Sequence, residues 1–198
     1  TNNSWLFAPS SLILANYYLP LNGALAFYHN LEITLKNIIV LISTLILMTG
    51  CVAFKSPLPV GYSGATTTIS DSYSDHEGST AHFYIVNKIN GLFIEDSGYK
   101  TRVANSGRGF NMTPTMVSRE VATIEQIITI AGFVQFATDG QAMFGDSMLV
   151  SGDIKFTPNV NETYKVNGKL GESGSEVWLE NSKGEIVSEV VKPSAKKS

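Results

Sequence analysis

Nucleophilic catalysis needs a serine, threonine or cysteine beside a positioned histidine. Outside residues 1–34, the chain's histidines are His76 and His82. His76 lies in a Ser/Thr-rich stretch, and His82 begins an apolar strand pattern in which a structural imidazole is the simpler interpretation. No Gly-x-Ser-x-Gly, phosphate-loop or HExxH motif is present. We therefore expect no catalytic residue of this kind, and only chemistry by paired carboxylates stays open, because spatial pairs cannot be read from a sequence.

A short acidic group has residue types that suit a metal ion. It consists of Asp71, Asp75, His76 and Glu77. The spacing matches no calcium loop, because the expected glycine and bidentate glutamate positions are absent. We interpret the group as part of a solvated linker and expect neither a metal nor a cofactor.

All three arginines, Arg102, Arg108 and Arg119, fall within eighteen residues. Arginine offers a planar fork of donors that suits a carboxylate or a phosphate, and glycines beside it allow a ligand or partner to approach. The three are therefore candidates for binding an anion or a partner protein. The alternative is that they pair with local acids such as Glu95, Asp96 and Glu120.

Composition limits the class of protein. The 198 residues are 43% hydrophobic and 16% charged, with a net charge of -3, which suits one moderate domain. A pI of about 5.6 without runs of lysine or arginine argues against a nucleic-acid partner. A single cysteine, Cys51, excludes an internal disulfide and a multi-cysteine zinc site.

An apolar segment precedes that cysteine. Residues 38–48 read IIVLISTLILM and follow Lys36. A helix of this length rises about 16 Å, which is short of the roughly 30 Å hydrocarbon layer. The segment is therefore typical of the hydrophobic region of a signal peptide.

The residues Met48-Thr49-Gly50-Cys51 resemble the lipobox of bacterial lipoproteins. Gly50 matches the small residue that the lipoprotein signal peptidase requires, and Met48 replaces the usual leucine. The resemblance implies cleavage before Cys51 and a diacylglyceryl thioether on its thiol. The alternative is a buried free thiol after a transmembrane helix.

The resemblance also implies a location. In Gram-negative lipoproteins an Asp after the cysteine favours the inner membrane, and here that position is Val52. We expect a lipid-anchored protein of the bacterial cell envelope, held by Cys51 and facing the periplasm from the outer membrane.

These features divide the chain into five parts. Residues 1–34 precede the signal, and we interpret them as an over-extended N-terminus without function, with translation beginning at Leu35. Residues 35–50 are then the signal peptide. Residues 51–79 are the lipidated cysteine and a flexible linker rich in Pro, Gly, Ser and Thr, in which residues 66–69 could pair as an edge strand. Residues 80–192 form the folded domain, and residues 193–198 are a disordered tail.

Short β-branched and apolar runs alternate with turn residues from position 80 onward. Strands are predicted over 81–87, 92–95, 123–137, 148–156, 163–170, 176–180 and 185–191. Asn90-Gly91 predicts a tight hairpin turn. Residues 114–131 also show helical spacing, but their β-branched content favours a strand. We predict an all-β, two-layer antiparallel β-sandwich of the immunoglobulin-like kind.

Two stretches, residues 101–114 and residues 151–180, resemble the mature domains of uncharacterised Gram-negative envelope lipoproteins. The resemblance implies a β-rich periplasmic domain and carries no catalytic residues. We expect a binding or structural role with an envelope protein as partner. The alternative is a lipoprotein enzyme that acts on an envelope glycan or peptide through carboxylates.

Overall fold

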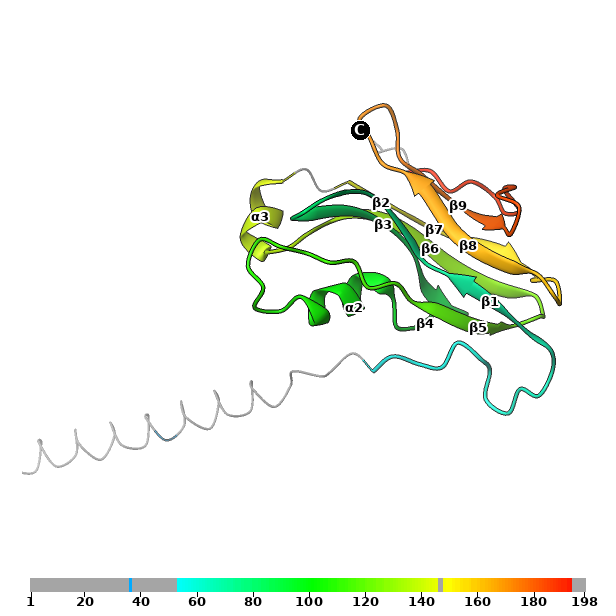
Figure 1. Ribbon diagram of the computed structural model, residues 1–198. Coiled ribbons are helices and arrows are strands. Elements are labelled where there is room, and N and C mark those ends of the chain that lie inside the picture. The colour runs from blue at the N-terminus through cyan, green and yellow to red at the C-terminus, as the bar shows by residue number, and fades with distance from the viewer. Residues whose placement is uncertain (1–35, 37–52, 146–147, 194–198) are drawn as a thin grey trace, which may run out of the picture. The chain divides into compact units, whose positions relative to one another are not determined.

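The computed structural model describes Lys36, residues 53–145 and residues 148–193, and the described residues from 53 onward contain two packed β-sheets (Figure 1). The lipobox and the other predictions for residues 1–35 and 37–52 lie outside the described residues, as does the tail from residue 194. In chain order the elements are β1 Thr66–Ser70, β2 Ser72–Glu77, β3 Thr80–Ile89, β4 Leu92–Phe93, α2 Ser97–Ala104, β5 Ser118–Ala122, β6 Gln126–Phe136, α3 Asp139–Phe144, β7 Leu149–Phe156, β8 Thr163–Lys169 and β9 Glu176–Asn181.

The predicted all-β sandwich is confirmed. One sheet has the order β5-β1-β8-β9, and the other has the order β2-β3-β6-β7 with β4 paired to β3. Every neighbouring pair is antiparallel except β1 and β8, which run parallel. The expectation of a wholly antiparallel sandwich was wrong at this pair, because β1 comes from a segment that the sequence assigned to the linker.

The main hydrophobic core lies between the two sheets. One sheet contributes residues such as Ile69, Val121 and Leu179, and the other contributes residues such as Val86 and Ile130, all fully buried. Alternate residues of each strand face this layer, which is the period of two expected for a strand with one buried face. Burial of these side chains is the main contribution that favours folding.

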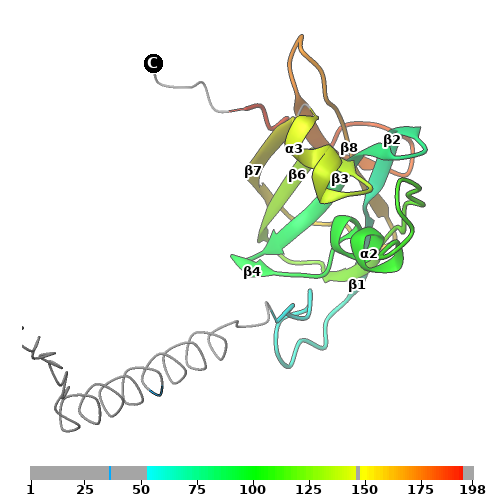
Figure 2. The same cartoon turned by 90° about the vertical axis from the view of Figure 1, so that its left-hand side faces the viewer.

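A smaller apolar cluster covers the outer face of β3 and β6. Phe83 and Phe133 stack there with ring centroids 6.0 Å apart. Met112, from the loop after α2, belongs to the same cluster and is only 3% exposed. Both helices contact this sheet, α2 at β3 and α3 at β6 (Figures 1 and 2). The five-stranded sheet is therefore covered on both faces.

Most strands form where the sequence predicts them. The Asn90-Gly91 turn is confirmed, with positive φ angles of 50° and 78° between β3 and β4, as such a tight turn requires. The ambiguous stretch over residues 114–131 contains β5 and the first half of β6, so the strand interpretation is correct. After β9, the predicted strand over 185–191 pairs only through isolated bridges, at Ile186 and at Val191.

Neither helix was predicted, although both begin at a capping residue. The Asp96 side chain accepts a hydrogen bond from the Tyr99 amide at the start of α2, and the Thr138 hydroxyl accepts one from the Gln141 amide at the start of α3. Asp and Thr are favoured at this position because they satisfy an amide that the helix leaves free. The two capping residues, Asp96 and Thr138, are the local sequence signal from which the helices could have been predicted.

The predicted linker over residues 51–79 is wrong in its second half. Residues 66–70 form β1, which lies between β5 and β8 rather than at an edge, and residues 72–77 form β2. The preceding residues also contact the domain, since the Lys55 amide donates to the Phe93 carbonyl at 2.8 Å and the Phe54 ring lies 4.7 Å from the Tyr99 ring. The folded domain therefore begins well before residue 80.

Gly168 in β8 gives a test of the packing between the sheets. A Cβ at this position would lie 2.4 Å from the Glu176 carbonyl oxygen and 2.6 Å from the Tyr84 ring. We expect Gly168→Ala to lower the free energy of unfolding by about 1–3 kcal/mol, as overpacking does, in urea unfolding followed by circular dichroism. Gly171→Ala is the matched control, because nothing lies within 4 Å of its Cβ. Equal stability of the two variants would contradict this packing.

Candidate functional site

The three predicted binding arginines do not form one surface. Arg102 lies exposed on α2, and Arg108 lies exposed in the loop that follows it, where its Nη1 is 3.5 Å from the Asn105 Oδ1. Arg119 on β5 is only 6% exposed. Its guanidinium faces an acid that the sequence assigned to the linker, so Arg119 is removed from the candidate surface, while Arg102 and Arg108 remain on it.

The partner of Arg119 is Asp71, which lies between β1 and β2. The two side chains form a bidentate pair, with Nη1 2.6 Å from Oδ1 and Nη2 2.7 Å from Oδ2. Both are buried, with side-chain exposures of 4% for the arginine and 0% for the aspartate. Two parallel charge-assisted hydrogen bonds of this kind fix the orientation of both groups.

The Asp71 carboxylate also accepts three further hydrogen bonds. They come from the Val86 amide in β3 at 2.9 Å, from the Ser97 amide at 2.9 Å and from the Ser97 hydroxyl at 2.8 Å. The Ser97 Oγ in turn accepts from the Val117 amide. One carboxylate thereby connects the junction of β1 and β2 with β3, the first turn of α2 and β5.

This arrangement has the properties of a structural centre. The carboxylate accepts five hydrogen bonds, so it offers no free lone pair to a substrate proton. The Arg119 Nη2 also donates to the Glu95 carbonyl, which leaves Nε as its one nitrogen without a partner among the described residues. An incoming anion would have to displace Asp71, which the bidentate contact and the burial of both groups oppose.

Asp96, next to Ser97, has an altered acidity. Burial raises its pKa above the ordinary value and the charge of Asp71 raises it further, while the hydrogen bond from the Tyr99 amide and the charge of Arg119 lower it. Burial raises the pKa because it disfavours the charged form. The carboxylate that begins α2 is therefore harder to ionise than a free aspartate.

A second polar group lies at the β2–β3 hairpin. The Ser74 hydroxyl donates to Asp75 Oδ2 at 2.7 Å and lies 3.2 Å from the Tyr84 hydroxyl, and burial raises the pKa of Tyr84. The Nδ1 of His82 lies 3.1 Å from Asp75 Oδ2, without hydrogen-bond geometry. Because Ser74 donates to the carboxylate and not to the imidazole, the group does not form a nucleophile–base pair.

The acidic group considered for a metal ion does not come together. Asp71 lies in the buried ion pair, Asp75 lies beside His82, and the His76 Nε2 makes a hydrogen bond with the Met112 carbonyl oxygen at 2.7 Å. Among Lys36, residues 53–145 and residues 148–193, no cluster of three or more His, Cys, Asp or Glu residues could hold a metal ion.

Two of the pockets on the described part of the domain bear on the possible chemistry. A pocket of about 250 Å³ lies between residues 55–60 and the β3–β4 turn, including Ile89, Asn90 and Leu92. A wider one of about 560 Å³ is lined by Phe110, Phe136, Gln141 and their neighbours. Neither is lined by an aspartate or a glutamate, so neither presents the carboxylate pair that glycan or peptide hydrolysis would need.

Sequence reasoning missed Asp71 as a structural residue, because its burial is evident only in the structure. Thr67, Ile69 and Asp71 alternate as the buried positions of one short segment, and an acid that continues such a series needs a cationic partner. The composition of the segment concealed this pattern.

Comparison with protein-family models, curated proteins and solved structures finds no match for the chain.

The buried pair can be tested by a double-mutant cycle with Asp71→Asn and Arg119→Met. Each single change leaves a buried group without its partner and is expected to cost about 3–5 kcal/mol of unfolding free energy. We expect the double variant to be less destabilised than the sum of the two, with a coupling of about 1–3 kcal/mol. The exposed pair Lys155–Glu125 is the control, with side-chain exposures of 71% and 64% and a coupling of at most about 1 kcal/mol. Additive effects at the buried pair would refute its role.

Asp96 predicts a pH dependence of stability. Because its pKa is raised in the folded state, the folded protein holds the proton more tightly, and stability is lost as pH rises from the ordinary aspartate pKa through the folded one. Asp96→Asn keeps an acceptor for the Tyr99 amide but does not titrate. We therefore expect the stability of this variant relative to wild type to increase as the pH rises above the ordinary aspartate pKa of about 3.9, measured by urea unfolding. A constant or falling difference would contradict the shift.

Proposed function

We propose that this protein is a lipid-anchored lipoprotein of the bacterial cell envelope, attached through Cys51, with a binding or structural role. The observation that carries the proposal is the agreement of two boundaries. The lipobox-like residues 48–51 place the cleavage before Cys51, and the compact unit that holds the whole sandwich begins at Ala53. Cleavage at that point would leave the folded unit intact.

The lipid would serve as the attachment to the membrane. Each buried methylene contributes about 0.8 kcal/mol, so a dual-chain anchor holds a protein stably without a spanning helix. In the portion of the chain that the structure describes, no helix has the length and apolar character needed to cross a bilayer. By the sorting rule for the position after the cysteine, Val52 favours the outer membrane.

A binding or structural role fits the surface better than the alternative of a carboxylate enzyme. Asp71 is saturated by hydrogen bonds, and the described pockets beside the β3–β4 turn and beside α3 have no acidic lining residues. Arg102 and Arg108 lie exposed along α2 and its following loop, where they are available to an acidic group on an envelope partner.

Intact-mass spectrometry of the membrane fraction tests the anchor. In cells that express the full gene, we expect a mature chain that begins at Cys51 and carries the mass of a diacylglyceryl group. Cys51→Ser should abolish both the added mass and the cleavage, because the modification requires the thiol. Ser56→Ala, five residues further on, is the control that should change neither.

A chain that keeps the residues before Cys51 and carries no lipid would refute the proposal. Residues 37–54 would then have to be reconsidered as a membrane anchor or a buried helix that contains a free thiol.

A further inference from the structure

The end of the sandwich at which residues 53–60 join the domain exposes a group of apolar side chains. Leu92 and Phe93 in β4 are 53% and 45% exposed, and Ile124 in the β5–β6 turn and Ile127 at the start of β6 are 44% and 46% exposed. Val60, in the segment that enters the domain, is fully exposed. Neighbouring exposed apolar residues of this kind mark sites of contact with proteins or membranes.

These residues are held close together by the backbone. The Asn90 amide donates to the Ile127 carbonyl at 2.7 Å, and the Ile127 amide donates to the Asn90 side chain at 3.0 Å. The Thr123 amide donates to the Ala65 carbonyl at 3.2 Å. The β3–β4 turn, the β5–β6 turn and the entering segment thus form one preformed surface, called here the anchor-side end and defined by Lys55, Val60, Lys88, Leu92, Phe93, Ile124 and Ile127.

The length of the chain limits how far this end can lie from Cys51. The Lys55 amide is hydrogen-bonded to the Phe93 carbonyl, and four residues of fully extended chain span at most about 14 Å. The headgroup layer on each side of a bilayer is about 5–8 Å thick. A lipid chain on Cys51 would therefore hold β4 at or just above the headgroups.

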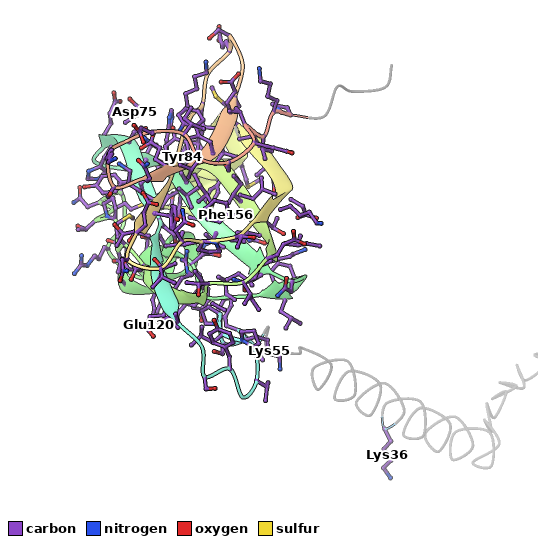
Figure 3. All side chains as sticks on the ribbon, turned by 90° about the vertical axis from the view of Figure 1, so that its right-hand side faces the viewer. Lys36, Lys55, Asp75, Tyr84, Glu120 and Phe156 are labelled. Carbon is purple, nitrogen blue, oxygen red and sulfur yellow. The ribbon has the colours of Figure 1, made fainter. Side chains whose placement is uncertain are left out.

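The charges at this end also suit a lipid surface. Lys88 Nζ lies 4.4 Å from the centre of the Phe93 ring, and within the described residues neither Lys55 nor Lys88 pairs with an acid. The nearby acids Glu95 and Glu125 each face a lysine, Lys100 at 2.9 Å and Lys155 at 3.0 Å. Figure 3 shows Lys55 and Glu120 at one end of the sandwich and Asp75 at the other. Because Glu120 is also exposed there, apolar contact provides the main attraction and the lysines add to it.

We propose that the anchor-side end is a membrane-contact surface, through which the domain rests on phospholipid headgroups instead of standing away from them on a linker. The inference rests on the proposed lipid anchor. Aromatic and aliphatic side chains flanked by lysines bind the boundary between headgroups and acyl chains, and lysines near an anionic surface strengthen the attachment.

Environment-sensitive labels on two exposed leucines test the contact. Leu92→Cys lies in the anchor-side end, while Leu149→Cys, 66% exposed, begins β7 opposite Phe133, far along β6 from Ile127. The thiol of Cys51 is blocked by its lipid, so each variant of the full chain takes one nitrobenzoxadiazole label. The labelled, acylated proteins are reconstituted into vesicles of phosphatidylcholine, with and without phosphatidylglycerol.

We expect the label at residue 92 to shift its emission to shorter wavelength and to be quenched by doxyl-labelled lipid. The label at residue 149 should keep the emission wavelength that it has in aqueous solution. The difference should persist without phosphatidylglycerol and increase with it, because apolar contact is the larger part. Each variant is first compared with wild type by circular dichroism.

Intact mass measured on the same samples separates the two proposals. If Cys51 carries lipid and both labels stay in water, or both labels are quenched, the proposed contact surface is wrong. The proposed lipid anchor is then still supported. An absence of lipid on Cys51 would overturn the anchor and, with it, the inference that depends on it.

Discussion

The buried ion pair between Asp71 and Arg119 is the interaction on which the rest of the domain depends. A carboxylate with 0% side-chain exposure is stable only if its charge and its lone pairs are fully satisfied. Here the satisfying groups come from β3, from the start of α2 and from β5. These segments can adopt their positions only together, so the pair specifies how the helix and the second sheet meet.

The same pair explains why the chain before residue 80 is part of the domain. Asp71 connects β1 and β2, and β1 lies between β5 and β8 as an inner strand. The residues before β1 continue along the domain as far as Lys55. A lipid on Cys51 would therefore hold the sandwich close to the bilayer, and the surface that faces the lipid would be determined by the fold.

Whether the sequence predicts a feature of this structure depends on how far apart in the chain the interacting residues lie. Hairpins and alternating strands are local, so β3, β6 and β8 could be predicted from their own residues. The parallel pairing of β1 with β8 and the bond between Asp71 and Arg119 join residues far apart in the chain, and nothing near Asp71 reveals its partner. The Ser/Thr/Gly composition around β1 and β2 is typical of a linker, and burial against the other strands overrides it.

The arginines show the same limit. Their clustering in the sequence suggested one surface, but Arg119 is on a strand and points into the domain, whereas Arg102 and Arg108 lie on a helix and its following loop that the sequence did not reveal. The capping residue Asp96 was visible in the sequence, but its burial beside Asp71 was not, because that depends on the tertiary arrangement.

Native-state hydrogen exchange of the full chain is the measurement that tests this account most directly. The amides of Val86, Ser97 and Val117, which are hydrogen-bonded to Asp71 or Ser97, should exchange as one slow group together with β1, and all should lose protection together in Asp71→Asn. If residues 66–70 exchange as fast as an unstructured peptide while β3 and β6 stay protected, the first strand does not belong to the domain and the account is wrong.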